Sequence, residues 1–180
     1  MTISNNKGVT LVALIVTIVV IIIIASITAK VGMDLVYKSR VENFVTNMLI
    51  IKSKARVIEE EVESKIWDFG NEIDDETGLT KKEKGRREHF ANEYDFELIE
   101  DASKYKMKHL DEDAAYYALT ENALKKMGLR SLWEEEKSYY VVKYTIKDSK
   151  YEDIEVYYTK GVKYKTNKYY SLSMMQEILN

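Results

Sequence analysis

The sequence predicts an α+β fold in which a long amino-terminal helix packs on a small antiparallel β-sheet. Apolar residues recur at helical spacing between residues 41 and 69. Near the carboxyl terminus, apolar and polar residues alternate with the period of two that is typical of half-buried strands. An uncharged apolar run, Val9 to Ala29, precedes both patterns. A chain of 180 residues fits one domain with an appended segment.

The long helix is expected to run from about Thr10 to Phe69 and to end near Gly70. Its second half carries an apolar stripe, built from positions seven residues apart and from positions three residues after them. The same stripe describes a membrane-tethered coiled coil, so by itself it leaves both packing against the chain's own domain and dimerisation open. The stripe consists of Val41, Phe44, Met48, Ile51, Ala55, Ile58, Val62 and Phe69.

A highly charged segment, residues 71–103, follows the long helix. Thr80 and Glu83 have the spacing of a capping box and predict a short helix. Three acidic residues close to Gly78 raise the hypothesis of a calcium site, but their spacing does not match the EF-hand loop. We therefore expect a solvated loop and no metal at Asp74, Asp75 and Glu76.

The segment "DEDAAYYALTENALKKMG", residues 111–128, predicts a second helix that Asp111 or Asp113 caps. Thr120 could restart this helix, and Gly128 stands where a helix ends.

After residue 137, apolar and polar residues alternate along the chain. This alternation predicts two antiparallel strands, within residues 138–148 and 153–161, joined around "DSKYED". A further short hairpin is expected to turn at Thr166-Asn167. A brief terminal helix, "MMQEILN", is expected to be capped by Ser173 and Gln176.

The apolar run Val9–Ala29 decides what class of protein this is. At about 1.5 Å per residue its 21 residues reach about 30 Å, the thickness of a bilayer's hydrocarbon core. A cleaved secretory signal has a shorter apolar region of about 7–15 residues and a clear small-residue cleavage site. A retained single-pass anchor is therefore favoured, although Lys30, Lys38 and Arg40 after the run oppose export of the following domain.

The residues just before the apolar run indicate the class of protein more specifically than the run itself. A short polar leader ends in Lys7-Gly8, and "VTLVALIVTIVV" begins at once. This junction resembles the prepilin signal of type IV pilins and of the pseudopilins of type II secretion. The resemblance implies that a membrane aspartyl peptidase cuts between Gly8 and Val9, that Val9 is then N-methylated, and that the apolar helix is retained. Thr10 and Leu11 match the family's usual second and third mature residues.

The resemblance divides the chain into four parts. Residues 1–8 are the leader peptide, 9–30 the transmembrane and filament-core helix, 31–70 its amphipathic continuation, and 71–180 an exported α+β head. Two positions depart from the family pattern: Val9 replaces the common phenylalanine, and Ala13 replaces the common glutamate that pairs with a neighbour's terminal amine. The missing glutamate favours a minor subunit over a major one.

The partners implied by the resemblance are the prepilin peptidase, other pilin subunits with the assembly platform, and membrane lipid. The implied location is the cell membrane, with a single pass and an extracytoplasmic carboxy-terminal domain, or a surface filament. The alternative from another class is a membrane-tethered coiled-coil interaction protein with a small surface domain. A less favoured reading is a DNA-binding pilin of an uptake system, in which the lysines and tyrosines of residues 139–170 hold single strands.

The composition offers little for catalysis. The absence of cysteine excludes disulfides, thiolate metal sites and cysteine nucleophiles. His89 and His109 have no accompanying ligand pattern, and the seven glycines do not form a phosphate loop. We therefore expect no enzymatic activity, no cofactor and no metal.

Overall fold

A computed structural model describes residues 11–105, 107–132, 138–148 and 150–179, and it confirms the α+β class. The helices are α1 (Leu11–Lys65), α2 (Lys81–Tyr94), α3 (Glu121–Lys126) and α4 (Leu172–Leu179), with short 3-10 helices η1 (Ala102–Tyr105) and η2 (Arg130–Leu132). The strands are β1 (Phe96–Leu98), β2 (Ala114–Leu119), β3 (Tyr140–Lys147), β4 (Lys150–Tyr164) and β5 (Asn167–Ser171).

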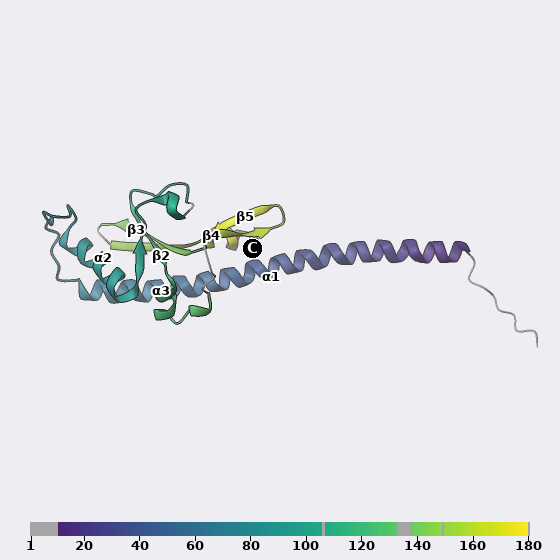
Figure 1. Ribbon diagram of the computed structural model, residues 1–180, viewed down its shortest axis with the longest axis horizontal. Helices are drawn as coiled ribbons and strands as arrows, with labels where there is room; N and C mark the ends of the chain where they lie inside the picture. Colours follow the sequence, from purple (N-terminus) through teal and green to yellow (C-terminus); the bar gives the residue numbers. More distant parts are fainter. Residues whose placement is uncertain (1–10, 106, 133–137, 149, 180) are drawn as a thin grey trace, which may run out of the picture.

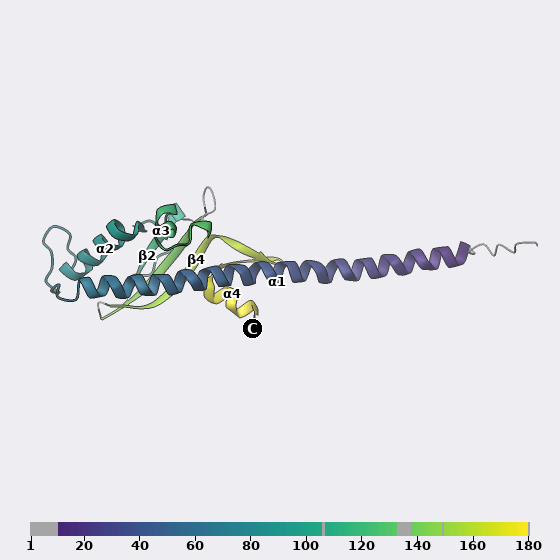
Figure 2. The ribbon, with the colours of Figure 1, turned by 90° about the horizontal axis from the view of Figure 1, so that it is seen from below.

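The helix α1 has 55 residues and therefore a length of roughly 80 Å. Its carboxy-terminal half lies along the sheet, whereas its amino-terminal half projects away from the rest of the chain (Figure 1). The helix continues without a break along its whole length, Gly32 included (Figure 2).

The five strands form one antiparallel sheet in the order β1-β2-β3-β4-β5, so each strand pairs with its neighbour in the sequence. The predicted strand pair is β3 and β4, whose central register places Val142 opposite Val156. The predicted second hairpin is β4 and β5, but it turns at Lys165-Thr166 rather than at Thr166-Asn167, because Asn167 already pairs with Tyr164 as the first residue of β5. Strand β1 was not predicted from the sequence.

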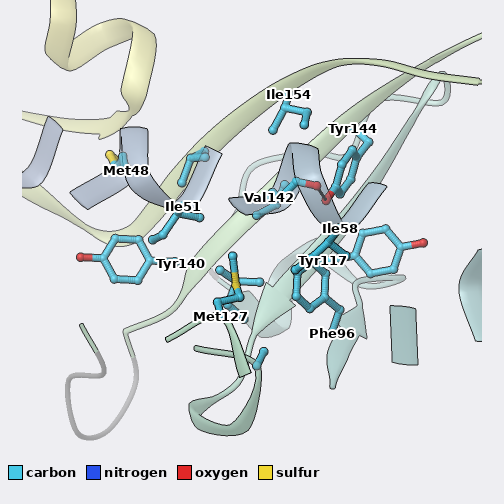
Figure 3. Packing of buried hydrophobic residues seen from close by; sticks show 14 of the residues in the cluster. Met48, Ile51, Ile58, Phe96, Tyr117, Met127, Tyr140, Val142, Tyr144 and Ile154 are labelled. Carbon is cyan, nitrogen blue, oxygen red and sulfur yellow. Dashed lines mark hydrogen bonds between the residues drawn. The ribbon is translucent and has the colours of Figure 1, made fainter. Parts of the chain in front are cut away.

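The main core lies between α1 and one face of the sheet. Met48, Ile51 and Ile58 of α1 belong to the same cluster as Val142, Tyr144 and Ile154 of the sheet (Figure 3). The predicted stripe is thus confirmed as far as Val62, with Phe44 partly buried beside it. Val45 and Ile66, which the heptad pattern did not include, are also buried in this cluster.

The end of α1 differs from the prediction. The helix ends at Lys65 rather than near Gly70, and Phe69 is 41% exposed instead of being part of the buried stripe. Ile66 takes the buried position at the end of the stripe. Phe69 turns toward Gly85 of α2, where a side-chain methyl would come within 2.5 Å of its ring.

The predicted helix at residues 111–128 is wrong in its first half. Residues 114–119 form β2, and only Glu121–Lys126 is helical. Strand β2 is buried on both faces: Ala115, Tyr117 and Leu119 face the main core, and Tyr116 and Ala118 face a second cluster under η1. A strand buried on both faces shows no alternation of polar and apolar residues, so its pattern cannot be told from that of a buried helix.

Two of the four predicted caps are confirmed; Asp111 and Asp113 cap no helix, because residues 114–119 form β2. The Thr80 and Thr120 side chains accept hydrogen bonds from the amides of Glu83 and Ala123, at 3.1 and 3.0 Å, and cap α2 and α3. The cap of α4 is Ser171, which accepts a hydrogen bond from the Met174 amide at 3.3 Å, whereas the predicted Ser173 and Gln176 both lie inside the helix.

Candidate functional site

The amino-terminal half of α1 is the candidate functional surface, because the large aliphatic side chains described there are about half exposed to solvent. Side chains of this half are described for residues 14–26 and again from Gly32 onward. Ten large aliphatic residues are between 46 and 64% exposed, and they lie on every face of the helix. They are Leu14, Ile15, Val16, Ile18, Val19, Val20, Ile21, Ile22, Ile23 and Ile24.

The two hydroxyl side chains in this stretch are satisfied by the helix itself. Thr17 donates a hydrogen bond to the Leu14 carbonyl at 2.8 Å, and Ser26 donates to the Ile22 carbonyl at 2.7 Å. Back-bonding of this kind gives a hydroxyl a partner without water. The surface of residues 14–26 therefore presents hydrocarbon and no polar group that requires solvent.

The predicted processing residues are placed as follows. Lys7, Gly8, Val9 and Thr10 lie outside the described residues. Leu11 is the first residue of α1, and Ala13 lies in its first turns; the side chains of both are not described. No helix among the described residues combines the length and apolarity that crossing a membrane requires.

The second half of α1 is fastened to the head by polar contacts as well as by the stripe. The Tyr144 hydroxyl donates to the Ala55 carbonyl at 3.1 Å inside the core, and Arg56 donates from Nη2 to the Glu152 carbonyl at 3.0 Å. The head therefore holds the second half of a continuous helix, whereas the described side chains of residues 14–26 are exposed.

A buried ion cluster joins α1, α2 and β4 at the far end of the head. Arg86 binds Glu63 through Nη2 and Glu83 through Nη1, each at 2.7 Å, and its guanidinium lies 4.5 Å from the centre of the Tyr151 ring. Burial alone would raise the pKa of Glu63, but hydrogen bonds from Lys82 and Arg86 outweigh it and hold that pKa below its ordinary value. Every carboxylate in this cluster has a cationic partner, so the cluster fastens helices and offers no free acid or base.

The acidic loop considered for calcium uses its oxygens internally. Asp74 accepts hydrogen bonds at Oδ1 from the Thr77 amide and hydroxyl, at 3.0 and 2.8 Å, and its Oδ2 pairs with Lys84 at 3.0 Å. Among the described residues, no three histidine or acidic side chains form a group that could hold a metal ion.

The histidines and tyrosines singled out in the sequence have structural surroundings. His89 Nδ1 lies 2.6 Å from Glu93 on the same helix, and His109 lies 3.4 Å from Asp111. Tyr144 is fully enclosed in the core, and this burial raises the pKa of its hydroxyl well above the ordinary value. Other tyrosines considered for base stacking are buried as well: Tyr140, Tyr151 and Tyr158.

Comparison of the chain with protein-family models, with curated proteins and with solved structures found no match.

Proposed function

We propose that this chain is a type IV pilin-like or pseudopilin subunit, and a minor one, assembled through its amino-terminal helix. The observation that carries the proposal is the division of α1: its second half packs on an antiparallel sheet, whereas residues 14–24 expose large aliphatic side chains on every face. The residues Lys7-Gly8 before that helix give the junction at which such subunits are cut.

The hydrophobic effect favours a state in which the aliphatic side chains of residues 14–24 are covered by an apolar surrounding. Keeping ten large aliphatic side chains in water costs on the order of 1–2 kcal/mol for each. Lipid tails or neighbouring copies of the same helix would both remove that cost. Movement of the helix from lipid into a filament would exchange one apolar surrounding for another, so extraction would not require wetting it.

The head geometry argues against the coiled-coil alternative. The stripe that would form a coiled-coil seam, including Val41, Met48 and Val62, is occupied by the chain's own sheet. The DNA-binding alternative loses support for a similar reason, because Tyr140, Tyr144 and Tyr158 are in the core.

In this proposal, the subunit is cut after Gly8 by a prepilin peptidase and is N-methylated at Val9. Residues 9–30 lie in the membrane until assembly, and the head lies outside the cytoplasm. Position 13 holds alanine instead of the glutamate whose carboxylate would pair with a neighbour's terminal amine. The absence of this carboxylate fits a subunit present in few copies.

Co-expression with a prepilin peptidase tests the proposal. The full chain should lose eight residues, and Gly8→Leu should block that loss, because a protease that needs the bare backbone of glycine cannot accept a branched side chain there. Gly32→Leu is the matched control: a side chain at Gly32 meets nothing within 4 Å, so this variant should be processed normally. Normal processing of Gly8→Leu would refute the proposed cut.

A further inference from the structure

We propose that the hairpin of β4 and β5, residues 160–170, is a second membrane contact, whose lysines bind the anionic headgroups of the bilayer that holds residues 9–30. The proposal concerns the head and goes beyond the anchoring helix. It rests on the proposed function in one respect, the placement of residues 9–30 in a membrane.

The hairpin carries positive charge that the head does not neutralise. Residues 160–170 include no acidic residue, and Lys163, Lys165 and Lys168 are exposed. Within the described part of the chain, no ion pair joins these three lysines to an acidic group. Lys163 and Lys168 are direct cross-strand partners, an arrangement in which like charges destabilise a sheet. A negative surface outside the head would relieve this repulsion.

One face of the hairpin has the composition of a bilayer interface. Because residues two apart in a strand share a face, Tyr170 lies on the face of Lys168 and of its partner Lys163. The other face carries Val162 and Tyr169, which pack on the main core. Tyr170 is 43% exposed. Tyrosine is enriched at the level of lipid headgroups, since its ring is apolar and its hydroxyl is polar.

Strand β4 leads along α1 toward the anchoring segment. Lys52 pairs with Asp153 at 3.9 Å, and the Phe44 ring lies 5.0 Å from the Tyr158 ring. From Asp153 to Tyr158 the strand advances roughly 17 Å, and from Lys52 to Phe44 the helix covers roughly 12 Å. The strand therefore runs beside the helix in the opposite direction, slightly inclined to it. Figures 1 and 2 show the β4–β5 hairpin as the part of the sheet nearest to the amino-terminal half of α1.

The same inclination gives the height of the hairpin above the membrane. From Tyr158 to Tyr164 the strand advances roughly 20 Å, which brings the turn level with about Leu35. Leu35 lies roughly 7 Å along the helix from Lys30, the first charged residue after the apolar run. The headgroup layer is about 5–7 Å thick, and the Debye length at 0.1 M salt is about 10 Å. The lysines are thus within electrostatic reach of the headgroups.

The surface of α1 at this height has a similar mixed character. Leu35 is 63% exposed and Val36 is 67% exposed. Lys38 and Arg40 are exposed as well, and the one acid in residues 30–40 is Asp34. Apolar side chains among cations are typical of a segment at the boundary between hydrocarbon and water. The helix and the hairpin therefore present cations to the same plane.

An anionic lipid surface is the partner that the anchoring geometry supplies. A chain anchored by residues 9–30 keeps the hairpin next to headgroups at all times, which gives a high effective concentration. Each lysine near an anionic surface strengthens binding roughly fivefold, and salt weakens it. A second copy meets the hairpin rarely when the subunit is present in few copies. The lipid contact fixes the orientation of the head on the bilayer before assembly.

Fluorescence quenching by lipids measures the height of the hairpin in the full chain. Because the chain has no native cysteine, Thr166→Cys places one fluorophore at the exposed turn. The protein is reconstituted at a low protein-to-lipid ratio in phosphatidylcholine vesicles that contain a headgroup nitroxide lipid, with or without phosphatidylglycerol. Quenching should be strong with phosphatidylglycerol. It should fall roughly threefold without it, and also in about 1 M salt, where the Debye length is about 3 Å.

Neutral variants identify the lysines as the cause. Lys163→Gln, Lys165→Gln and Lys168→Gln together should lower the quenching to its level in pure phosphatidylcholine. The fold should tolerate these changes, because they remove a like-charge pair from the sheet. The matched control removes the same charge from three exposed lysines elsewhere on the head: Lys108→Gln, Lys125→Gln and Lys150→Gln. The control should be quenched like the unmodified hairpin.

Three results would overturn the inference. One is equal quenching with and without phosphatidylglycerol, and another is an equal loss in both triple variants. The third is quenching that changes with the protein-to-lipid ratio, which would assign the hairpin to a neighbouring copy. A fluorophore at Glu76→Cys, in the exposed loop between α1 and α2, should be weakly quenched in every sample. Strong quenching there would contradict the orientation of the head.

The same samples separate this inference from the proposed function. Flotation of the vesicles shows whether the chain is anchored in the bilayer. A chain that floats with the vesicles but shows no charge-dependent quenching contradicts only the hairpin contact. A chain that does not float contradicts the membrane placement in the proposed function, and the hairpin contact with it. Cutting after Gly8 does not enter this experiment, so its failure would leave the lipid contact standing.

Discussion

At the scale of single residues, the least expected side chain is Arg86, a cation that is 1% exposed. Its position on α2 is fixed by Glu63 on α1 and by Glu83 one turn before it. Tyr151 of β4 covers the guanidinium face and donates from its hydroxyl to Glu83 at 3.3 Å. This group of four joins three elements that are distant in the sequence.

Removing this cation should destabilise the head more than removing its neighbour. Arg86→Met leaves two carboxylates short of a partner in a buried site and should cost roughly 2–4 kcal/mol. Arg87→Met is the matched control: its side chain is one-third exposed, so its ion pair with Glu83 is worth under about 1 kcal/mol. Urea unfolding of the full chain in detergent, followed by near-ultraviolet circular dichroism, measures both. Equal losses would contradict the assigned role of Arg86.

Glu59 is the residue that should make stability depend on pH. Burial raises its pKa above 4.5, and the nearby charge of Glu63 adds to that effect. An acid with a raised pKa in the folded state loses stability as the pH rises through that value, because the buried form must then be charged. Glu59→Gln should therefore stabilise the head by roughly 0.5–1 kcal/mol at pH 7.5, with the gain disappearing near pH 4.

Unfolding midpoints of Glu59→Gln at pH 7.5 and pH 4 check this prediction. The control is Glu60→Gln, since Glu60 is the adjacent and exposed acid. A gain of the same size at both pH values, or the same gain from the control, would show that burial of the charge at Glu59 is not the cause.

At the scale of elements, the sequence predicted the helices and strands that bury only one face, because burial of one face gives a regular alternation of apolar and polar residues. The stripe from Val41 to Val62 and the hairpin of β3 and β4 are of this kind. Strand β2 could not be predicted, because it is buried on both faces and contains three alanines, which favour helices. Strand β1 has only three residues, too few for a periodic signal.

Beyond the end of α1, Phe69 makes a contact that the heptad pattern does not contain. Gly85 on α2 leaves room for the Phe69 ring, and a methyl group at Gly85 would lie 2.5 Å from it. Gly85→Ala should therefore give little or no stabilisation alone, although alanine is favoured over glycine in a helix by about 1 kcal/mol. In a Phe69→Ala background the same change should stabilise the head by roughly that amount. Identical effects in both backgrounds, measured by urea unfolding, would rule out the contact.

The bare half of α1 should be intolerant of charge. Ile21→Asp places a carboxylate in the middle of the apolar run and should cost roughly 2.5–3.5 kcal/mol of membrane insertion. Val57→Asp is the control, because Val57 is an exposed apolar residue of the same helix beside the head. Membrane fractionation should show a large loss of Ile21→Asp from the membrane and normal recovery of Val57→Asp. Equal recovery would show that residues 14–26 are not held in lipid.

At the scale of the whole molecule, the sheet and the small helices pack on the second half of α1. Residues 14–24 of the same helix expose aliphatic side chains, which we propose are covered by lipid or by neighbouring helices. The composition of this segment and the junction at Gly8 could be read from the sequence. The cluster of Glu63, Glu83, Arg86 and Tyr151 could not, because Tyr151 is far from the other three residues in the chain and only the fold places its ring against Arg86.

The proposed pilin-like function depends most directly on where the mature chain begins. Mass spectrometry of the amino-terminal peptide, from protein made in a cell that has a prepilin peptidase, measures this start. We expect a peptide that begins at Val9 and carries one added methyl group on its terminal amine. A peptide that begins at Met1, or at a residue after Ala29, would contradict the account.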